Sequence, residues 1–341
     1  MSTDRRAGPA RRRRPPRRGA VAAWAAIAAV GLLACGPAAQ PPAAPARAAE
    51  GPFVRVLGTA QDGGLPHAGC ACDRCEAARH DPGLRRRVAS LAVVLPASGR
   101  VYLVDATPDL REQLDALADV RRPPPGRVDR SPVDGILLTH AHMGHYLGLV
   151  FLGREAIASD GLPVWATPRM GDFLAGSGPW SQLLSLGNVE LRGLAPGEAV
   201  DLGDGVTATA VPVPHREEYS DTVGFRLRGP RATLLYVPDT DSWEAWGGAL
   251  DGALAGVDVA LVDGTFHSAD ELPGRALAEI PHPMIADSVH RFAPAVAAGR
   301  LRVLFTHLNH SNPALDRDGP ERRALEAAGF AVLEEGQELP L

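Results

Sequence analysis

The 341-residue chain is long enough for one large domain or two ordinary ones, and its content of 45% hydrophobic and 22% charged residues is typical of a soluble globular protein. The net charge is −5, yet the first 34 residues hold eight arginines and one aspartate, so the remainder is more acidic than the total. An acidic body disfavours nucleic acid as the main partner, and we expect none.

The N-terminal residues have the layout of an export signal. A basic region ends at Arg18, an apolar stretch follows over residues 19–34, and small residues surround Cys35. Because roughly 20 apolar residues are needed to span a bilayer comfortably, this stretch is short for a permanent anchor. The sequence "LLAC" resembles a bacterial lipobox, which implies that residues 1–34 are a signal peptide and that Cys35 is lipidated. We expect an exported lipoprotein that faces the periplasm or the cell exterior.

Two alternatives to lipidation stay open, namely a soluble signal cleaved near "ARAA" and an uncleaved anchor. Residues 35–51 are rich in proline and alanine and too poor in large apolar groups to pack, so they are predicted to form a tether. The folded domain is therefore expected over residues 52–341.

Strand and helix patterns alternate along this domain. Residues 52–60 are predicted to form a strand, and residues 91–106 two strands joined at a turn that contains glycine. Apolar residues at three- and four-residue steps predict helices over 107–120 and 146–157, on either side of a buried strand at 133–140. Further strands are expected at 162–167, 205–215, 222–229, 232–240, 257–265 and 302–310. Strands dominate both halves with helices between them, which predicts an α/β (α+β) fold, an αββα sandwich of two packed sheets with helices outside.

Side chains that can bind metals cluster just after these strands. His140 and His142 are two residues apart, so in an extended segment both rings point to the same side and can hold one ion. Entry into the next helix brings His145 towards a neighbouring ion. Three further donors each follow a strand, namely His215, Asp239 and His307. Zinc-type metals need three or four such donors, so a metal site is predicted at the strand ends.

The ordered motifs "THAHMGH", "PVPH", "YVPDTD" and "FTHLNH" resemble the metallo-β-lactamase superfamily over roughly residues 53–320. That superfamily has the αββα sandwich fold, with its site at one edge. The resemblance implies that His140, His142 and His215 bind a first metal. It also implies that a second metal is bound by His145, Asp239 and His307. Asp239 would bridge the two metals, and Asp239 and His145 would act in catalysis.

Gly144 departs from the superfamily pattern, in which an aspartate at this position binds the second metal and partners the attacking water. Glycine has no donor atom, so the second metal should bind more weakly, and Gly144→Asp should tighten it. Asp241 compensates only if it reaches the site. Three outcomes stay open: two metals with a weakened second, one metal, or a catalytically silent protein.

Cys70, Cys72 and Cys75 form a C-x-C-x2-C cluster whose closely spaced thiolates suit a tetrahedral zinc ion. A fourth ligand is needed, and His282, which lies between two prolines, is the candidate. Unbound thiols, or one disulfide with an odd cysteine, are the alternatives. The remaining histidines are expected at the surface or behind the ligands: His80, His267, His290 and His310.

The segment "LGTAQDGGLPHAGCACDRC" resembles two branches of the superfamily, pyrroloquinoline quinone biosynthesis protein B and the cyclic phosphodiesterase of phosphonate breakdown. The second branch implies a structural zinc ion on the three cysteines and a histidine. We expect a metal-dependent hydrolase of a small-molecule phosphodiester or ester, with one or two ions of zinc, or else iron or manganese, at the histidines. The alternatives are an oxidative or accessory role in quinone-cofactor synthesis and a non-catalytic metal-binding lipoprotein. Asp105 is expected either to support the histidines from behind or to cap a turn.

Overall fold

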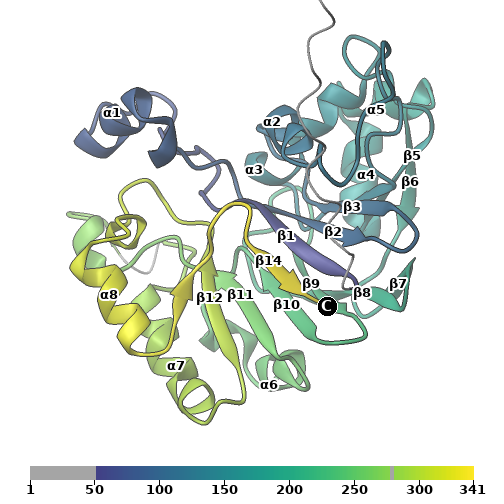
Figure 1. The fold of residues 1–341 in the computed structure, drawn as a ribbon. Helices are drawn as coiled ribbons and strands as arrows, with labels where there is room; N and C mark the ends of the chain where they lie inside the picture. The colour runs from purple at the N-terminus through teal and green to yellow at the C-terminus, as the bar shows by residue number, and fades with distance from the viewer. Residues whose placement is uncertain (1–50, 277–279) are drawn as a thin grey trace, which may run out of the picture. The chain divides into compact units, whose positions relative to one another are not determined.

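Two seven-stranded β-sheets form the centre of the protein in the computed structural model, which describes residues 51–276 and 280–341 (Figure 1). The first sheet has the order β14-β1-β2-β3-β4-β5-β6, and the second has the order β13-β12-β11-β10-β9-β8-β7. Each half of the domain builds one sheet, except that the C-terminal strand β14 pairs antiparallel with β1. The last residues of the chain therefore close the first sheet.

The first sheet consists of β1 (Phe53–Gly58), β2 (Ser90–Leu95), β3 (Arg100–Val104), β4 (Gly135–Leu137), β5 (Leu162–Ala166), β6 (Val189–Gly193) and β14 (Glu338–Pro340). The second consists of β7 (Ala199–Gly203), β8 (Val206–Pro212), β9 (Val223–Arg228), β10 (Thr233–Val237), β11 (Val259–Asp263), β12 (Arg302–Thr306) and β13 (Ala331–Val332). The strands predicted from the sequence all lie in these sheets. The strands β6, β7, β13 and β14 were not predicted.

Helices cover the outer face of each sheet (Figure 1). The first sheet carries α2 (Leu110–Asp115), α3 (Met143–Tyr146), α4 (Pro168–Gly176) and α5 (Trp180–Ser185). The second carries α6 (Ala249–Leu254), α7 (Ile285–Ala297) and α8 (Pro320–Ala327), and α1 (Asp73–His80) follows the cysteine segment. Short 3-10 helices lie at Pro82–Leu84, Leu147–Leu152, Glu244–Trp246, Ala269–Glu271 and Pro313–Leu315. The predicted αββα sandwich is confirmed.

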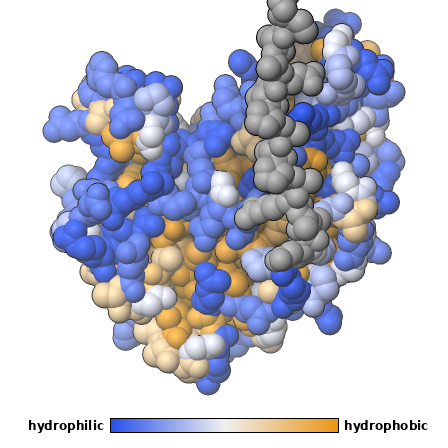
Figure 2. All heavy atoms as spheres, in the orientation of Figure 1, coloured by the Kyte–Doolittle hydropathy of each residue, from blue (hydrophilic) through white to orange (hydrophobic). Residues whose placement is uncertain are grey.

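The core of the domain lies in three layers, one between the sheets and one under each set of helices. Val93, Phe225 and Tyr236 belong to the layer between the sheets and are almost fully buried. Alternation along each strand sends one residue inwards and the next towards the helices, so both faces of the strands are apolar. Figure 2 shows hydrophilic residues over most of the visible face.

The predicted helix over residues 146–157 is wrong in type and length. α3 ends at Tyr146, and a 3-10 helix follows over Leu147–Leu152. Gly148 explains the change, because its N–H donates to the carbonyl of Ala106 at 2.9 Å and its Cα lies so close to Thr107 that a Cβ would overlap the Thr107 carbonyl oxygen. This tight contact holds the segment against the β3–α2 loop, where a regular helix does not fit.

The predicted signal peptide (residues 1–34) lies outside the described residues, and so does the tether apart from Gly51. Within the described part of the chain, every helix is too short or too polar to cross a bilayer.

We predict that Phe225→Ala lowers the free energy of unfolding by about 3–5 kcal/mol, because it opens a cavity between the two sheets. Urea unfolding at fixed metal concentration measures the change. Leu186→Ala is the matched control, since Leu186 is an exposed apolar residue and its loss should change the free energy by less than about 0.5 kcal/mol. Equal effects of the two substitutions would contradict the assignment of Phe225 to the core.

Candidate metal centre

The predicted metal ligands converge although they come from distant parts of the chain. His140 and His142 lie between β4 and α3, and His145 lies within α3. The segments after three strands of the second sheet bring the other donors to the same place: His215 after β8, Asp239 after β10 and His307 after β12. The site therefore lies where segments that follow strands of both sheets meet.

One group consists of His140, His142 and His215. The Nε2 atom of His140 lies 2.8 Å from Nδ1 of His142, and Nε2 of His215 lies 3.2 Å from the same atom. Two imidazole nitrogens about 2.0–2.1 Å from one tetrahedral ion are separated by roughly 3.4 Å. The three nitrogens are thus arranged as the ligands of one metal ion.

Hydrogen bonds behind this group fix the ring orientations. Thr139 Oγ1 lies 3.0 Å from Nδ1 of His140, and Nδ1 of His215 lies 3.0 Å from Asp241 Oδ1. An N–H donated from the outer nitrogen leaves the inner nitrogen as an acceptor for a metal. Asp241 therefore supports His215 from behind and does not replace the carboxylate that Gly144 lacks.

A second group consists of Asp62, His145 and His307, with Asp239 between the two groups. Nε2 of His145 lies 2.9 Å from Asp239 Oδ2 and 3.7 Å from Asp62 Oδ1. Asp239 Oδ2 also lies 3.7 Å from Nε2 of His140 in the first group. Asp239 thus contacts both groups, as a bridging ligand does.

Four polar atoms in and beside the second group are buried without a well-formed hydrogen bond, and two of them, His145 Nε2 and Asp239 Oδ2, have each other at 2.9 Å: Asp62 Oδ1, His145 Nε2, Asp239 Oδ2 and His307 Nε2. Each such atom costs about 1–3 kcal/mol when it is left unsatisfied. Two carboxylate oxygens and two ring nitrogens that face one another fit a metal cation, so the residues present suit a second ion.

Asp62, which was not predicted as a ligand, lies in the loop after β1 (Phe53–Gly58). Its carboxylate lies beside Gly144, where a Cβ would overlap Asp62 Oδ1 and come within 3.0 Å of its Cγ. The expectation that Gly144→Asp strengthens the site therefore conflicts with the structure, because the space for that side chain is filled. The one sequence feature that could have indicated this ligand is "QDGG" in the loop, where an acidic residue precedes two glycines.

Burial and charge prepare the ligands for a cation. Burial lowers the pKa of His140 well below its ordinary value, so its ring is neutral at neutral pH. Burial acts to raise the pKa of Asp239, but the nearby rings of His307 and His145 outweigh it and lower that pKa well below the ordinary value. Burial also opposes the charged form of His145, yet Asp105 and Asp239 raise its pKa well above the ordinary value. The negative field that favours a proton here equally favours a metal ion.

Asp105 supports the site from behind rather than only capping a turn. Nδ1 of His145 donates to its Oδ2 over 2.7 Å, and the backbone N–H of Thr139 donates to its Oδ1 over 2.8 Å. Asp105 and His307 both have left-handed backbone conformations, with φ of 69° and 59°. Such conformations cost about 1–3 kcal/mol in residues other than glycine and are found at functional sites.

His310, and not His282, lies beside the three cysteines, which corrects the predicted fourth ligand. Its Nδ1 lies 3.7, 3.7 and 3.5 Å from the Sγ atoms of Cys70, Cys72 and Cys75. Ligands of tetrahedral zinc at about 2.3 Å for sulfur and 2.0 Å for nitrogen are separated by roughly 3.5 Å. All three cysteines are free, so the structure contains no disulfide among them.

His282 instead lies at the histidine centre. Its Nδ1 donates to Asp263 Oδ2 over 2.8 Å and lies 3.7 Å from Asp239 Oδ1. The two prolines beside it hold its segment just before α7 (Ile285–Ala297). The signal for His310 was its place in "THLNH", three residues after His307.

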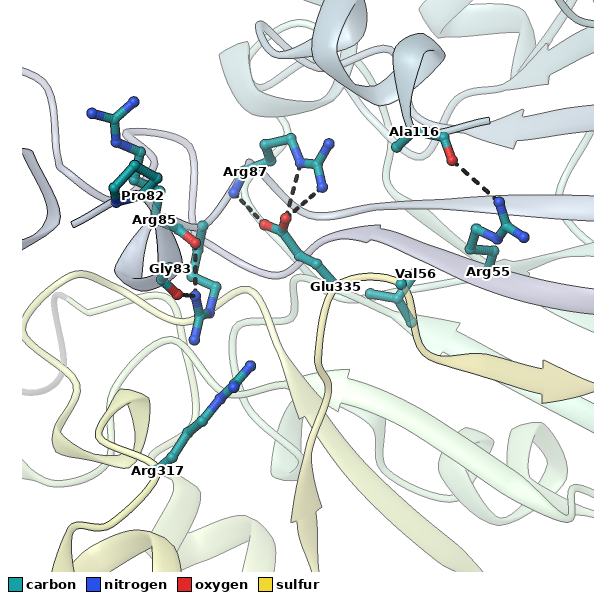
Figure 3. A pocket seen from close by; sticks show the side chains of 11 residues that line it. Arg55, Val56, Pro82, Gly83, Arg85, Arg87, Ala116, Arg317 and Glu335 are labelled. Carbon is teal, nitrogen blue, oxygen red and sulfur yellow. Dashed lines mark hydrogen bonds and ion pairs between the residues drawn. The ribbon is translucent and has the colours of Figure 1, made fainter. Parts of the chain in front are cut away.

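A separate cavity of about 390 Å³ is lined by five arginines (Figure 3). Arg87 pairs with Glu335 at 2.6 Å, Arg317 pairs with Glu334 and Arg55 with Glu338. Arg86 also pairs with Glu334, whereas Arg85 donates to the backbone carbonyls of Ala78 and Arg79. No predicted metal ligand lines this cavity, so it is distinct from the metal centre.

The family model for the beta-lactamase superfamily domain matches residues 100–308. The chain belongs to the beta-lactamase superfamily. It is 28% identical to coenzyme PQQ synthesis protein B of Cupriavidus necator over 84% of this chain and 99% of that protein. The crystal structure of Zn²⁺-bound PqqB from Methylobacterium extorquens is similar, with a TM-score of 0.72 and 26% identity over 85% of this chain and all of that chain.

A diphosphatase of the PhnP family is also similar, with a TM-score of 0.60 and 25% identity over 84% of this chain and 96% of that one. These similarities confirm the superfamily and the two branches that the sequence resembles.

We predict that His310→Ala lowers the zinc content by about one ion per chain, because the cysteine cluster loses its fourth ligand. Metal analysis of protein purified under reducing conditions measures the loss, and faster modification of the cysteines by a thiol reagent reports it independently. His282→Ala is the control and should leave the thiols protected. Protection lost in His282→Ala and kept in His310→Ala would restore the sequence-based assignment.

Proposed function

We propose that this superfamily member is a metal-dependent hydrolase of a small-molecule phosphodiester or ester. The convergence of seven metal-ligating side chains on adjoining sites carries the proposal: Asp62, His140, His142, His145, His215, Asp239 and His307. The similarity to a diphosphatase of the PhnP family supports the phosphoryl class of substrate. Carboxylate and imidazole donors suit zinc, and they also suit iron or manganese.

When bound, divalent metal ions supply Lewis acidity and lower the pKa of a water molecule at the site. The protein's own residues orient the ligands and exclude bulk water from the inner side. Asp105 and Asp263 hold the rings of His145 and His282 by hydrogen bonds, and neither carboxylate is exposed. The ligand geometry is therefore set before the substrate arrives.

The substrate approaches from the side of His142. Its side chain is 16% exposed, whereas those of His140 and His145 are at most 1% exposed. Nε2 of His142 donates to Glu218 Oε2 over 3.0 Å, and the neighbouring Tyr219 is exposed. The loop after β8 (Val206–Pro212) thus borders the open side of the site, where a substrate contacts protein.

A second candidate is a role in quinone-cofactor synthesis, favoured by the similarity to coenzyme PQQ synthesis protein B. In that role the histidine centre would hold iron and take part in an oxidation. Iron in the purified protein together with no hydrolysis of phosphodiesters, esters or lactones would favour it. Zinc together with hydrolysis of a model phosphodiester would favour the first proposal.

We also propose export and lipid anchoring through Cys35, on the basis of the basic region, the apolar stretch and "LLAC". A metal centre on the periplasmic or outer side would act on substrates outside the cytoplasm. Synthesis of a cofactor inside the cell fits that location less well than hydrolysis does.

We predict that His142→Ala lowers hydrolysis of a model phosphodiester by about 100-fold or more, since loss of a residue that only supports a metal ligand already costs about 10–100-fold. The fold should persist because the side chain is partly exposed and lies outside the core. Initial rates with metal-analysed protein measure the loss, and circular dichroism checks the fold.

His290→Ala is the control, because His290 is exposed on α7 (Ile285–Ala297), and it should hydrolyse the substrate at the original rate. Full activity in His142→Ala would remove His142 from the site.

We predict that Cys35→Ser moves the protein from the membrane fraction to the soluble fraction or leaves an unprocessed precursor, because the lipid acceptor is lost. Fractionation of cells that express the full chain, together with the mass of the product, measures this. An unchanged membrane fraction would favour the uncleaved anchor.

A further inference from the structure

We propose that Asp62 is the carboxylate ligand of the second metal, supplied from the loop after β1 in place of a side chain at position 144. The assignment rests on the proposed metal centre and names the residue that completes it. In this arrangement Gly144 does not mark a lost site, because the charge that it lacks comes from another part of the chain.

The position of the Asp62 carboxylate is that of a ligand. Its Oδ1 lies 3.7 Å from Nε2 of His145 and 3.8 Å from Nε2 of His307. All three atoms are buried and lack a well-formed hydrogen bond, although Nε2 of His145 also lies 2.9 Å from Asp239 Oδ2. The Asp62 side chain is 23% exposed and could turn both oxygens to water, yet its Oδ1 faces two ring nitrogens, an arrangement that suits a cation held between them.

Gly144 and Asp62 depend on each other sterically. A Cβ at position 144 would overlap Asp62 Oδ1 and lie 3.0 Å from Cγ and 3.1 Å from Cα of the same residue. Turning the Asp62 side chain away would relieve the overlap with Oδ1, but it would also take the carboxylate out of the site, and the contact with the Asp62 Cα would still require a small backbone shift. Any side chain at position 144 therefore excludes Asp62 from its present position, and the glycine is what admits it.

The loop holds Asp62 firmly in this place. The N–H of Gln61 donates to the carbonyl of Leu308 over 2.9 Å, and the N–H of Leu308 donates to the carbonyl of Thr59 over 2.9 Å. These two bonds join the loop to the residue directly after His307. Asp62 and His307 are thus kept in register by the backbone, which suits a pair of ligands to one ion.

Substitution of both positions tests the proposal. Asp62→Asn keeps the shape of the side chain and removes its charge, and we expect it to weaken zinc at the second site by about tenfold or more. Gly144→Asp alone should weaken the second metal rather than tighten it, because of the overlap. The double variant Asp62→Gly with Gly144→Asp should recover binding, since it moves the carboxylate from one segment to the other.

Titration of metal-free protein with zinc and cobalt(II) against a competing chelator measures the affinities. Cobalt absorption separates the sites, because only the cysteine cluster gives a thiolate charge-transfer band. Asp270→Asn, an exposed acid, is the control for lost charge and should change nothing. Circular dichroism checks that each variant is folded. If the double variant does not fold, the zinc affinity of Asp62→Asn alone decides whether Asp62 is a ligand.

Unchanged affinity in Asp62→Asn, or tighter metal in Gly144→Asp alone, would overturn the proposal, and so would wild-type protein that binds a single ion at the histidine centre. The failure of the proposed function looks different. Wild-type protein that binds the second metal in an Asp62-dependent way, yet hydrolyses none of the substrates tested, would support the ligand assignment and refute the hydrolase.

Discussion

Buried imidazole rings and carboxylates lie together at the metal centre, and their carboxylate charge has to be balanced by protons or metal ions. This constraint determines how the site is built. Four buried polar atoms in and beside the second group face one another without a well-formed hydrogen bond. A buried polar atom left unsatisfied costs about 1–3 kcal/mol, so the cluster would be unfavourable in a site that never holds a cation. The two sheets tolerate such a cluster because their strand ends are rigid. The outer hydrogen bonds of Asp105, Asp241 and Asp263 keep the rings from turning away.

The histidine centre and the cysteine cluster share two segments of the chain. The loop after β1 carries Asp62 and then the three cysteines, while the turn after β12 carries His307 and then His310. The rings of His67 and His310 pack with centroids 4.4 Å apart, so the segments also contact one another directly. A zinc ion at the cysteines would therefore brace the same two segments that bring Asp62 and His307 together.

Short-range patterns predicted most of the strands, because alternation and apolar runs depend on neighbours in sequence. Of the four strands that were not predicted, β13 and β14 are only two and three residues long and form because a long-range partner is present. The 3-10 helix after Tyr146 escaped for the same kind of reason. Its apolar spacing is helical, but the contact of Gly148 with Ala106 and Thr107 decides its geometry.

The sequence by itself determined the superfamily and the αββα sandwich, and it named candidate ligands that stand in ordered motifs after strands, such as His140 and Asp239, which the fold brings together. It could not determine which histidine meets the cysteines or what fills the space beside Gly144. His310 is at least 235 positions away from each of the three cysteines. Asp62 and Gly144 are about eighty positions apart. Only the packing of the loops against one another decides these pairings. The chemistry of a side chain limits what it can bind, but the fold determines which side chains are its neighbours in space.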